Sequence, residues 1–340
     1  MKTSSFFFDL PEHLIAQTPA QRRSLSRLMV IDRAAETISH DTVDNLHEYI
    51  PAESIFVINN SKVRKARVYA KLESGIEVEL LFLEDIDRFT WTAMAKKSKR
   101  LKPGRTLLLP GGITATVSAA RTDGIRELTL SEELEESFFQ NYGHVPLPPY
   151  IQRDDTFEDE QRYQTIYAEK SGSVAAPTAG LHLSEEILDA LRRKGVTIAP
   201  ITLHVGTGTF LPIRTEEISD HSMHFERYEI DSAAESVINR AMASGQPITA
   251  VGTTSVRTLE ASVLETGRLK SGNYRTNLYI KPGFNFRCVS HLMTNFHTPG
   301  STLLVLVAAF AGYDLIMRAY REAVEQQYRF FSYGDSMLII

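Results

Sequence analysis

Short runs of alternating apolar and polar residues follow one another between residues 68 and 146, and turn signals separate them. A period of two places successive side chains on opposite faces of a strand, and tight turns join such strands as neighbours. The predicted strands are 67–72, 76–83, 90–95, 106–109, 113–119 and 127–130. Strands this short close into a small β-barrel or half-barrel. We therefore expect a small inserted β domain at 68–147 within a discontinuous main domain, 1–67 plus 148–340.

Positive charge gathers at two places in a chain whose formal net charge is −5. One is a predicted hairpin of the inserted domain, and the other is the strand that leads into that domain. Such an edge is typical of contact with a nucleic-acid backbone, although charged edges also block aggregation and a charge run is often a solvated face. The residues are Lys96, Lys97, Lys99 and Arg100 in the hairpin, and Lys62, Arg64 and Arg67 in the strand.

The composition is that of a globular protein, with 43% hydrophobic and 23% charged residues. The single cysteine, Cys288, excludes an internal disulfide framework and a multi-cysteine zinc site. The longest apolar run, from Leu303 to Ala311, is much shorter than the roughly 20 residues that a membrane span needs. We therefore expect a cytoplasmic protein that does not enter a membrane.

Two loops of small residues flank a predicted helix and strand between residues 171 and 210. The first, 175–182, reads Ala-Ala-Pro-Thr-Ala-Gly-Leu-His, and the second, 206–210, reads Gly-Thr-Gly-Thr-Phe. Small residues let a ligand approach the backbone, although their composition alone favours two ordinary tight turns. Phe210-Leu211-Pro212 follows the second loop instead of a helix, which excludes a Rossmann-type site there.

A further predicted site lies where a strand at 248–252 runs into Thr253-Thr254-Ser255 and a helix. Free N–H groups at a helix start, with Arg257 in the first turn, make an anion site by geometry. The alternative is simple capping of the helix by hydroxyl groups. Asn59-Asn60 also has two readings. The pair could form a turn, or its amide groups could bind a base or a ribose.

Metal binding is not expected. His221, His224 and Glu226 have a spacing that suggests ligation, but Phe225 and Tyr228 between and after them indicate a strand, and no third convincing ligand accompanies the two histidines.

Several segments match one known family in the expected order along nearly the whole chain. They are Phe8-Asp-Leu-Pro-Glu12, Leu14-Ile-Ala-Gln17, Asn59-Asn60, 142–151, 175–182, Thr202-Leu-His-Val-Gly206, 252–260, Thr294-Asn-Phe-His297 and 329–335. No one segment is decisive, but together they are highly specific. In them the sequence resembles the S-adenosylmethionine:tRNA ribosyltransferase-isomerase family of queuosine biosynthesis. Two positions depart from its pattern: Thr298-Pro-Gly-Ser301 stands where Leu-Pro-Lys-Ser is expected, and Lys281 where an aromatic residue is usual.

The resemblance implies a mixed α/β (α+β) fold, with a β-barrel main domain, flanking helices and an inserted smaller barrel-like domain. It implies that the ribosyl part of S-adenosylmethionine is transferred onto 7-aminomethyl-7-deazaguanine at the wobble position of tRNA with a GUN anticodon. The ribosyl unit rearranges to an epoxycyclopentane, adenine and methionine leave, and the product is epoxyqueuosine. S-adenosylmethionine is consumed, so no resident cofactor and no metal are expected. We also expect a monomer.

The implied chemistry suggests roles for individual residues. A sulfonium acidifies the neighbouring C5′ protons, and a histidine suits the base that removes one. His182 and His297 each end a polar loop and are preferred over the other histidines, while Asp335 or Glu226 is expected to assist the departure of adenine. The expected substrate-binding residues are Asn59, Asn60, Thr178, Gly180, His204, Gly206, Thr207, Thr253, Thr254, Ser255, Arg257, Asn295 and Tyr333. The seven cations named above are expected to hold tRNA.

Two other functions remain open from the sequence. One is a paralogue of the same fold that acts on another substrate, which the departure at Thr298-Pro-Gly300 allows. The other is a non-catalytic RNA-binding barrel protein, against which the loops with His and Asn argue, because binding alone does not need them.

Overall fold

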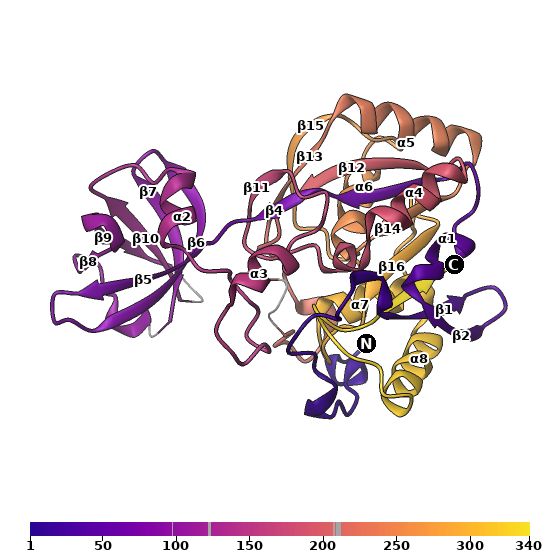
Figure 1. Ribbon diagram of the computed structural model, residues 1–340, viewed down its shortest axis with the longest axis horizontal. Helices are drawn as coiled ribbons and strands as arrows, with labels where there is room; N and C mark the ends of the chain where they lie inside the picture. Colours follow the sequence, from indigo (N-terminus) through magenta and orange to yellow (C-terminus); the bar gives the residue numbers. More distant parts are fainter. Residues whose placement is uncertain (97, 122–123, 207, 209–211) are drawn as a thin grey trace.

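The inserted domain is a closed six-stranded barrel that stands to one side of the main domain (Figure 1). The computed structural model describes residues 1–96, 98–121, 124–206, 208 and 212–340. The barrel strands are β5 (Arg67–Leu72), β6 (Glu77–Asp87), β7 (Thr90–Ala95), β8 (Thr106–Leu108), β9 (Thr114–Ala120) and β10 (Ile125–Leu130). They pair antiparallel in the closed order β10-β7-β6-β5-β8-β9. The predicted small barrel is thus confirmed.

Alternating residues of these strands fill the barrel. Leu80 and Phe82 of β6 are buried, and Trp91 of β7 is 5% exposed. The helix α2 (Glu136–Tyr142) closes the packing, because the ring of Phe139 lies 5.6 Å from that of Phe82 and 5.4 Å from that of Trp91. The period of two in the sequence therefore corresponds to one buried face and one solvent face.

The main domain is built on a nine-stranded mixed sheet in the order β15-β13-β12-β3-β14-β16-β17-β1-β2. The strands are β1 (Arg27–Asp32), β2 (Thr37–Thr42), β3 (Ile55–Asn59), β12 (Thr197–Leu203), β13 (Glu226–Ile230), β14 (Ile248–Val251), β15 (Gly272–Thr276), β16 (His291–Asn295) and β17 (Ser336–Ile339). The strands β12, β3, β14 and β16 run parallel to one another.

This sheet differs from the barrel expected for the main domain. The two end strands, β15 and β2, each pair on one side only in the part of the chain that the structure describes. Parallel strands joined by crossover helices become covered on both faces, and such a sheet twists without having to close. The mixed α/β class and the inserted barrel are confirmed, whereas the main sheet is open.

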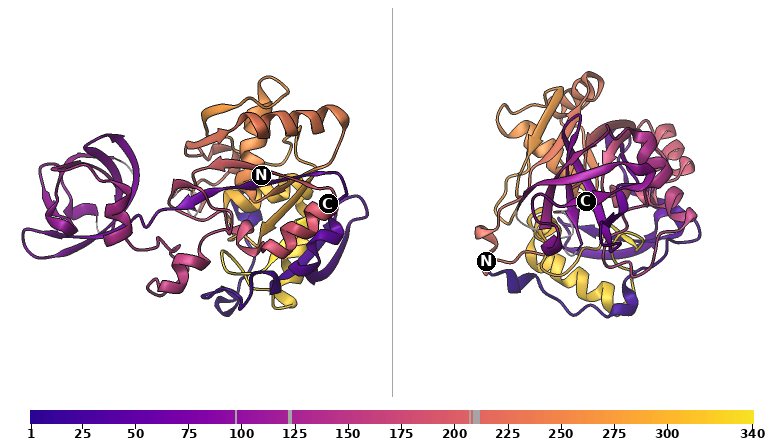
Figure 2. Two further views of the ribbon diagram at one scale, coloured as in Figure 1. Left: turned by 45° about the horizontal axis from the view of Figure 1, so that its top comes forward. Right: turned by 90° about the vertical axis from the view of Figure 1, so that its left-hand side faces the viewer.

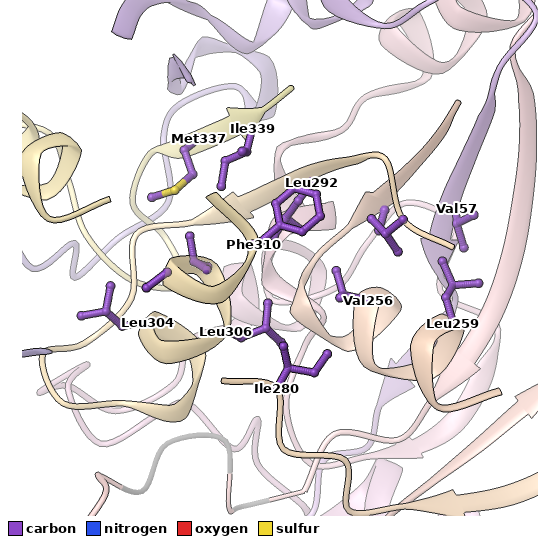
Figure 3. Close-up of a cluster of buried hydrophobic side chains, with 14 of the residues drawn as sticks. Val57, Val256, Leu259, Ile280, Leu292, Leu304, Leu306, Phe310, Met337 and Ile339 are labelled. Carbon is purple, nitrogen blue, oxygen red and sulfur yellow. The ribbon is translucent and has the colours of Figure 1, made fainter. Parts of the chain in front are cut away.

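Helices cover both faces of the main sheet. Along β1, Met29 and Ile31 join one buried cluster, and Leu28 and Val30 join another on the opposite face. The first face packs against α5 (Ser232–Ser244), α6 (Thr253–Leu264), α7 (Thr302–Ala311) and α8 (Tyr313–Glu325). The second packs against α1 (Leu46–Tyr49) and α4 (Glu185–Arg193). Figure 3 shows the first cluster, to which Val256 of α6 and Leu304 of α7 both contribute.

Two neighbouring segments lead from the main domain toward the barrel. The chain leaves the main domain through β4 (Ser61–Val63), beside which β11 (Lys170–Ser173) runs parallel (Figure 2). The return from the barrel includes α3 (Phe157–Arg162). At the barrel's base, Arg67 and His144 pair in an isolated antiparallel bridge, which holds the outgoing and returning chain together.

No described helix is by itself both long and apolar enough to cross a membrane. The pair α7 and α8, which is bent by 118°, meets the criteria of length and composition when its two helices are taken together.

Candidate functional site

A cavity of about 400 Å³ lies between the barrel and the main domain. Its size falls in the range of pockets that hold small-molecule ligands. Arg227 Nη2 of the main domain lies 3.2 Å from Glu84 Oε2 of the barrel, so an ion pair joins the two sides. This interdomain cavity is lined by residues that include Arg64, Leu83, Glu84, Asp85, Thr92, His204, Gly206, Glu226, Arg227 and Arg275.

A smaller pocket of about 60 Å³, which we call the inner pocket, adjoins this cavity. Val205 lines both spaces. The inner pocket lies where the 3-10 helix Thr178–His182, the start of α6 and the end of β16 meet. Its lining includes the predicted substrate-binding residues Thr178, Thr253, Thr254 and Asn295, and the predicted base His297. The fold thus gathers residues that are far apart in the sequence.

Glu226 and Arg257 form a buried ion pair at the edge of the interdomain cavity. Each side chain is 5% exposed, and Arg257 Nη1 donates to Glu226 Oε2. Glu226 Oε1 also accepts the N–H of Gly206 at 3.1 Å, and Arg257 Nε donates to the carbonyl of Leu278 at 3.1 Å. Arg257 therefore positions Glu226 and the loop at 206. Its Nη2 is buried without a hydrogen-bond partner among the described residues.

The predicted bases His182 and His297 are both buried. His182 Nε2 lies 2.9 Å from Asn295 Nδ2, and His297 Nε2 lies 2.9 Å from the hydroxyl of Thr294. Burial lowers the pKa of each ring to about 3, and the charges of Arg23 and Arg329 add to the effect at His182. Both rings are therefore neutral at physiological pH.

His204 follows β12 and lines the interdomain cavity. Its Nδ1 is buried without a hydrogen-bond partner among the described residues. Burial lowers the pKa of the ring, and the guanidinium groups of Arg227 and Arg64 lower it further. The ring packs against Gly172, where a Cβ would lie 3.3 Å from Nδ1, so a larger residue there would require the ring to shift by a few tenths of an ångström.

Asn59 and Asn60 have structural hydrogen bonds. Asn59 Nδ2 donates to the carbonyl of Leu203, and its Oδ1 accepts the N–H groups of Leu203 and Ser61. Asn60 Oδ1 accepts from the hydroxyl of Thr202 at 2.6 Å, and its Nδ2 donates to Glu169. The pair fastens the end of β3 to β12, and the chain passes there from β3 into β4 without a turn.

Three other predicted site residues are also held within the protein. Asp335 accepts the N–H groups of Arg27 and Arg329, and burial raises its pKa. Tyr333 donates its hydroxyl to Asp159 at 2.7 Å, and burial raises the pKa of that hydroxyl. Ser255 donates to the carbonyl of Val251. These contacts fix backbone segments around the inner pocket.

Gly180 is required by close packing. A Cβ at this position would lie 2.1 Å from the hydroxyl oxygen of Tyr167 and 2.8 Å from Thr165. The small residues of the loop 175–182 therefore serve dense packing as well as the inner pocket, because within this loop only residues 176–179 line that pocket.

The predicted tRNA-binding cations fall into two groups. Arg64 pairs with Glu136 at 2.9 Å, and Arg67 donates to the carbonyl of Leu147 and lies 3.3 Å from Glu79. These two hold the base of the barrel together. The exposed cations are Lys62 on β4 and, beside the barrel, Lys96, Lys99 and Arg100. Lys97 of this group and Thr207 of the substrate group lie outside the described residues.

The interdomain cavity includes residues that the sequence analysis did not select. Phe225 is 57% exposed, and the guanidinium of Arg275 lies 5.6 Å from the centre of its ring. Both line the cavity. A lone aromatic and an arginine 50 residues away carry no local sequence signal, and only the pairing of β13 with β15, which sets Arg227 opposite Arg275, brings this region together.

The departure from the family pattern at Gly300 has a structural counterpart. Gly300 has a φ of +65°, and a Cβ there would lie 2.6 Å from the ring of Phe7. The ring of Phe7 thus occupies the space that the Cβ of a lysine would need.

Within the described residues, no group of three or more His, Cys, Asp or Glu is arranged to hold a metal ion.

Comparisons with known proteins agree over the whole chain. Residues 3–339 match the family described as queuosine biosynthesis protein. The chain is 46% identical over 347 residues to the S-adenosylmethionine:tRNA ribosyltransferase-isomerase of Treponema denticola and 46% identical over 343 residues to that of Symbiobacterium thermophilum, with 100% of each chain covered. The crystal structure of an S-adenosylmethionine tRNA ribosyltransferase from Thermotoga maritima matches with a TM-score of 0.57 and 33% identity, over 99% of this chain and 100% of that one. This chain belongs to the queuosine biosynthesis protein family.

Proposed function

We propose that the protein transfers and isomerises the ribosyl part of S-adenosylmethionine onto 7-aminomethyl-7-deazaguanine in tRNA, giving epoxyqueuosine, adenine and methionine. The observation that carries this proposal is 46% identity over full length to a relative named for the ribosyltransferase-isomerase activity. S-adenosylmethionine is a consumed co-substrate, and the chemistry needs no metal.

The arrangement of the two spaces supports a placement for S-adenosylmethionine. The inner pocket, at about 60 Å³, accepts only a small part of that molecule, whereas the interdomain cavity, at about 400 Å³, has room for a nucleoside. Because Val205 lines both, we place the methionine end in the inner pocket, the sulfonium near Val205, and the ribose and adenine in the interdomain cavity. The modified base of tRNA would then enter from the cavity side.

For the base that removes a C5′ proton, the geometry favours His297 over His182. His297 lines the inner pocket, and its Nε2 contacts a hydroxyl, which can donate or accept. His182 Nε2 already faces the amide nitrogen of Asn295. For the departing adenine we favour Glu226, which lines the cavity, over Asp335, which accepts two backbone N–H groups.

The direct test is to incubate the protein with S-adenosylmethionine and tRNA that carries 7-aminomethyl-7-deazaguanine, followed by nucleoside mass spectrometry and detection of free adenine. We expect epoxyqueuosine and adenine in equal amounts. Tight tRNA binding without either product would instead favour a non-catalytic RNA-binding protein, and neither binding nor product would favour a paralogue with another substrate.

The same assay tests the assignment of His297 as the general base. Removing a general base lowers turnover by roughly 10²- to 10⁴-fold. We expect His297→Ala to lose at least about 100-fold in kcat. The control His13→Ala removes an exposed histidine whose Nε2 lies 3.0 Å from Gln327 Oε1, and it should leave kcat unchanged. Turnover by His297→Ala within several-fold of wild type would refute the assignment.

The barrel is the part that we propose to hold tRNA. Its exposed cations lie on the domain that forms one wall of the interdomain cavity, so an RNA bound to the barrel can present one base to that cavity. We further propose that residues 68–147 act as one unit, that the substrate has a GUN anticodon, and that the protein works as a cytoplasmic monomer. Sedimentation of the protein with and without tRNA tests the monomer.

A further inference from the structure

The orientation of the Asn295 side-chain amide is fixed by its neighbours. One atom of the amide lies 3.1 Å from the carbonyl oxygen of Phe331, which can only accept a hydrogen bond. That atom must therefore be the nitrogen, Nδ2, and the other must be the oxygen, Oδ1. No alternative flip of the amide satisfies the carbonyl.

The same nitrogen determines the state of His182. Nδ2 has a second hydrogen, which points to His182 Nε2 at 2.9 Å. His182 Nε2 must therefore be an acceptor, so the ring is neutral and carries its proton on Nδ1. A protonated ring would place N–H against N–H, and the lowered pKa of His182 agrees with this arrangement. The lone pair that a base would use is already engaged.

Asn295 Oδ1 is left as the free group. Asn295 is 2% exposed and lines the inner pocket, and its Oδ1 has no partner among the described residues. A buried amide oxygen without a donor is rare in folded proteins. It can accept from a ligand that carries N–H groups, and an ammonium group gives the strongest such bond.

The start of α6 offers the opposite chemistry in the same pocket. The N–H groups of Ser255 and Val256 reach the carbonyl of Gly252, whereas those of Thr253 and Thr254 have no backbone acceptor among the described residues. Free N–H groups at the start of a 12-residue helix attract a carboxylate. One pocket thus contains an acceptor for a cation and donors for an anion.

We infer that the inner pocket binds the α-amino acid end of S-adenosylmethionine, with its ammonium group on Asn295 Oδ1, its carboxylate at the start of α6, and His182 as a positioning residue that orients Asn295. The inference rests on the proposed function. It gives His182 a role in recognition of the amino group, and it leaves proton removal to another residue.

The test compares S-adenosylmethionine with its analogue that lacks the α-amino group, in the complete assay with tRNA. We measure the KM of S-adenosylmethionine and the inhibition constant of the analogue. For the wild-type protein we expect the analogue to bind at least about tenfold more weakly, as the loss of a charged hydrogen bond predicts. In Asn295→Leu the two ligands should bind within about threefold of each other.

The ratio of the analogue's inhibition constant to the KM of S-adenosylmethionine also tests the positioning role of His182. His182→Phe should reduce the discrimination and raise KM with little change in kcat, because the amide loses the acceptor that orients it. His182→Gln keeps an acceptor at this position and should recover part of the ratio, and His13→Phe is the matched control on the surface. If His182→Phe lowered kcat strongly and left the ratio unchanged, His182 would be a base and the positioning role would be overturned.

The wild-type measurement keeps the inference open to refutation even if a buried variant fails to fold. Wild-type turnover with equal binding of both ligands would overturn the inference and leave the proposed function intact. Failure of the wild-type protein to form epoxyqueuosine would refute the proposed function, and nucleoside mass spectrometry reads that outcome separately.

Discussion

The barrel and the main domain present polar groups in opposite ways. On the barrel, the cations that we expect to contact RNA are exposed, such as Lys96, whose side chain is 71% exposed. In the main domain, most polar residues of the inner pocket are buried and hydrogen-bonded, and among the described residues only a few buried atoms there, such as Asn295 Oδ1, lack a partner. A backbone of phosphates can be held by mobile surface charges, whereas one small molecule needs fixed, dry groups. The difference indicates two tasks within one chain.

The largest expected effect is that acid weakens the main domain far more than the barrel. The pKa values of His182 and His297 are lowered to about 3 by burial, and unfolding returns each ring to an ordinary pKa near 6.5. Below pH 6.5 the unfolded chain therefore binds protons that the folded main domain does not bind. Stability is full above pH 6.5 and is lost as the pH falls toward 3, by about 1.4 kcal/mol per pH unit for each ring.

The single tryptophan makes this effect measurable. Trp91 lies in β7, so its fluorescence follows the barrel, whereas far-ultraviolet circular dichroism follows the whole chain. Between pH 7 and pH 5 the urea midpoint from circular dichroism should fall more than the midpoint from Trp91. His144 is the only histidine between residues 68 and 147, and it is 47% exposed. If the two probes showed the same fall in the urea midpoint, acid would not weaken the main domain more than the barrel.

The second prediction concerns the buried ion pair. Glu226→Gln removes one partner of Arg257 and leaves a buried charge without its counter-ion, which should lower the free energy of unfolding by about 3 to 5 kcal/mol. The matched control is Glu229→Gln, three residues along β13, because Glu229 is 33% exposed and lies 3.5 Å from Lys170. That change should cost less than about 1 kcal/mol in urea unfolding. Similar costs for both variants would show that the pair at Glu226 is solvated.

The third prediction concerns a buried cation within the barrel. Arg126 is 9% exposed and donates to the carbonyls of Leu101 and Ser98, both at 2.7 Å. These bonds tie the segment that carries Lys99 and Arg100 to β10. Arg126→Met should destabilise the barrel by about 2 kcal/mol, since hydrogen bonds of a charged group are lost.

Trp91 fluorescence in urea measures this loss. The control is Arg121→Met, because the side chain of Arg121 is 50% exposed and pairs with Glu127 at the surface. If Arg126→Met and Arg121→Met shifted the urea midpoint of the barrel equally, other contacts would hold the segment that carries Lys99 and Arg100.

The smallest expected effect is on the salt dependence of tRNA binding. Replacing Lys96, Lys99 and Arg100 by Gln should change the free energy of unfolding by less than about 0.5 kcal/mol, because surface substitutions usually do. It should lower the slope of log affinity against log salt by roughly 0.7 to 0.9 for each phosphate contact removed. Filter binding at several salt concentrations measures the slope. An unchanged slope would place the tRNA on another surface.

Much of the fold could be predicted from the sequence because its signals are local. The alternation in β6 and the turns beside it indicated the barrel. The open main sheet was not foreseen, since strand order depends on which distant strands pair. The sequence showed polar tips at Asn59, His182 and Asn295, but it did not show which polar atoms are already bonded within the protein.

By itself, the sequence determined the small barrel, the lack of a disulfide framework and, through its motif segments, the family. Periodicity, cysteine count and motif order are properties of the chain alone, so no tertiary information is needed to read them. Only the tertiary structure decided that Arg257 pairs with Glu226 and that Asn295 faces both His182 and the carbonyl of Phe331. Hydrogen bonds between residues more than 30 positions apart depend on how the sheet and loops pack, and that packing settles which buried polar atom is left for a ligand.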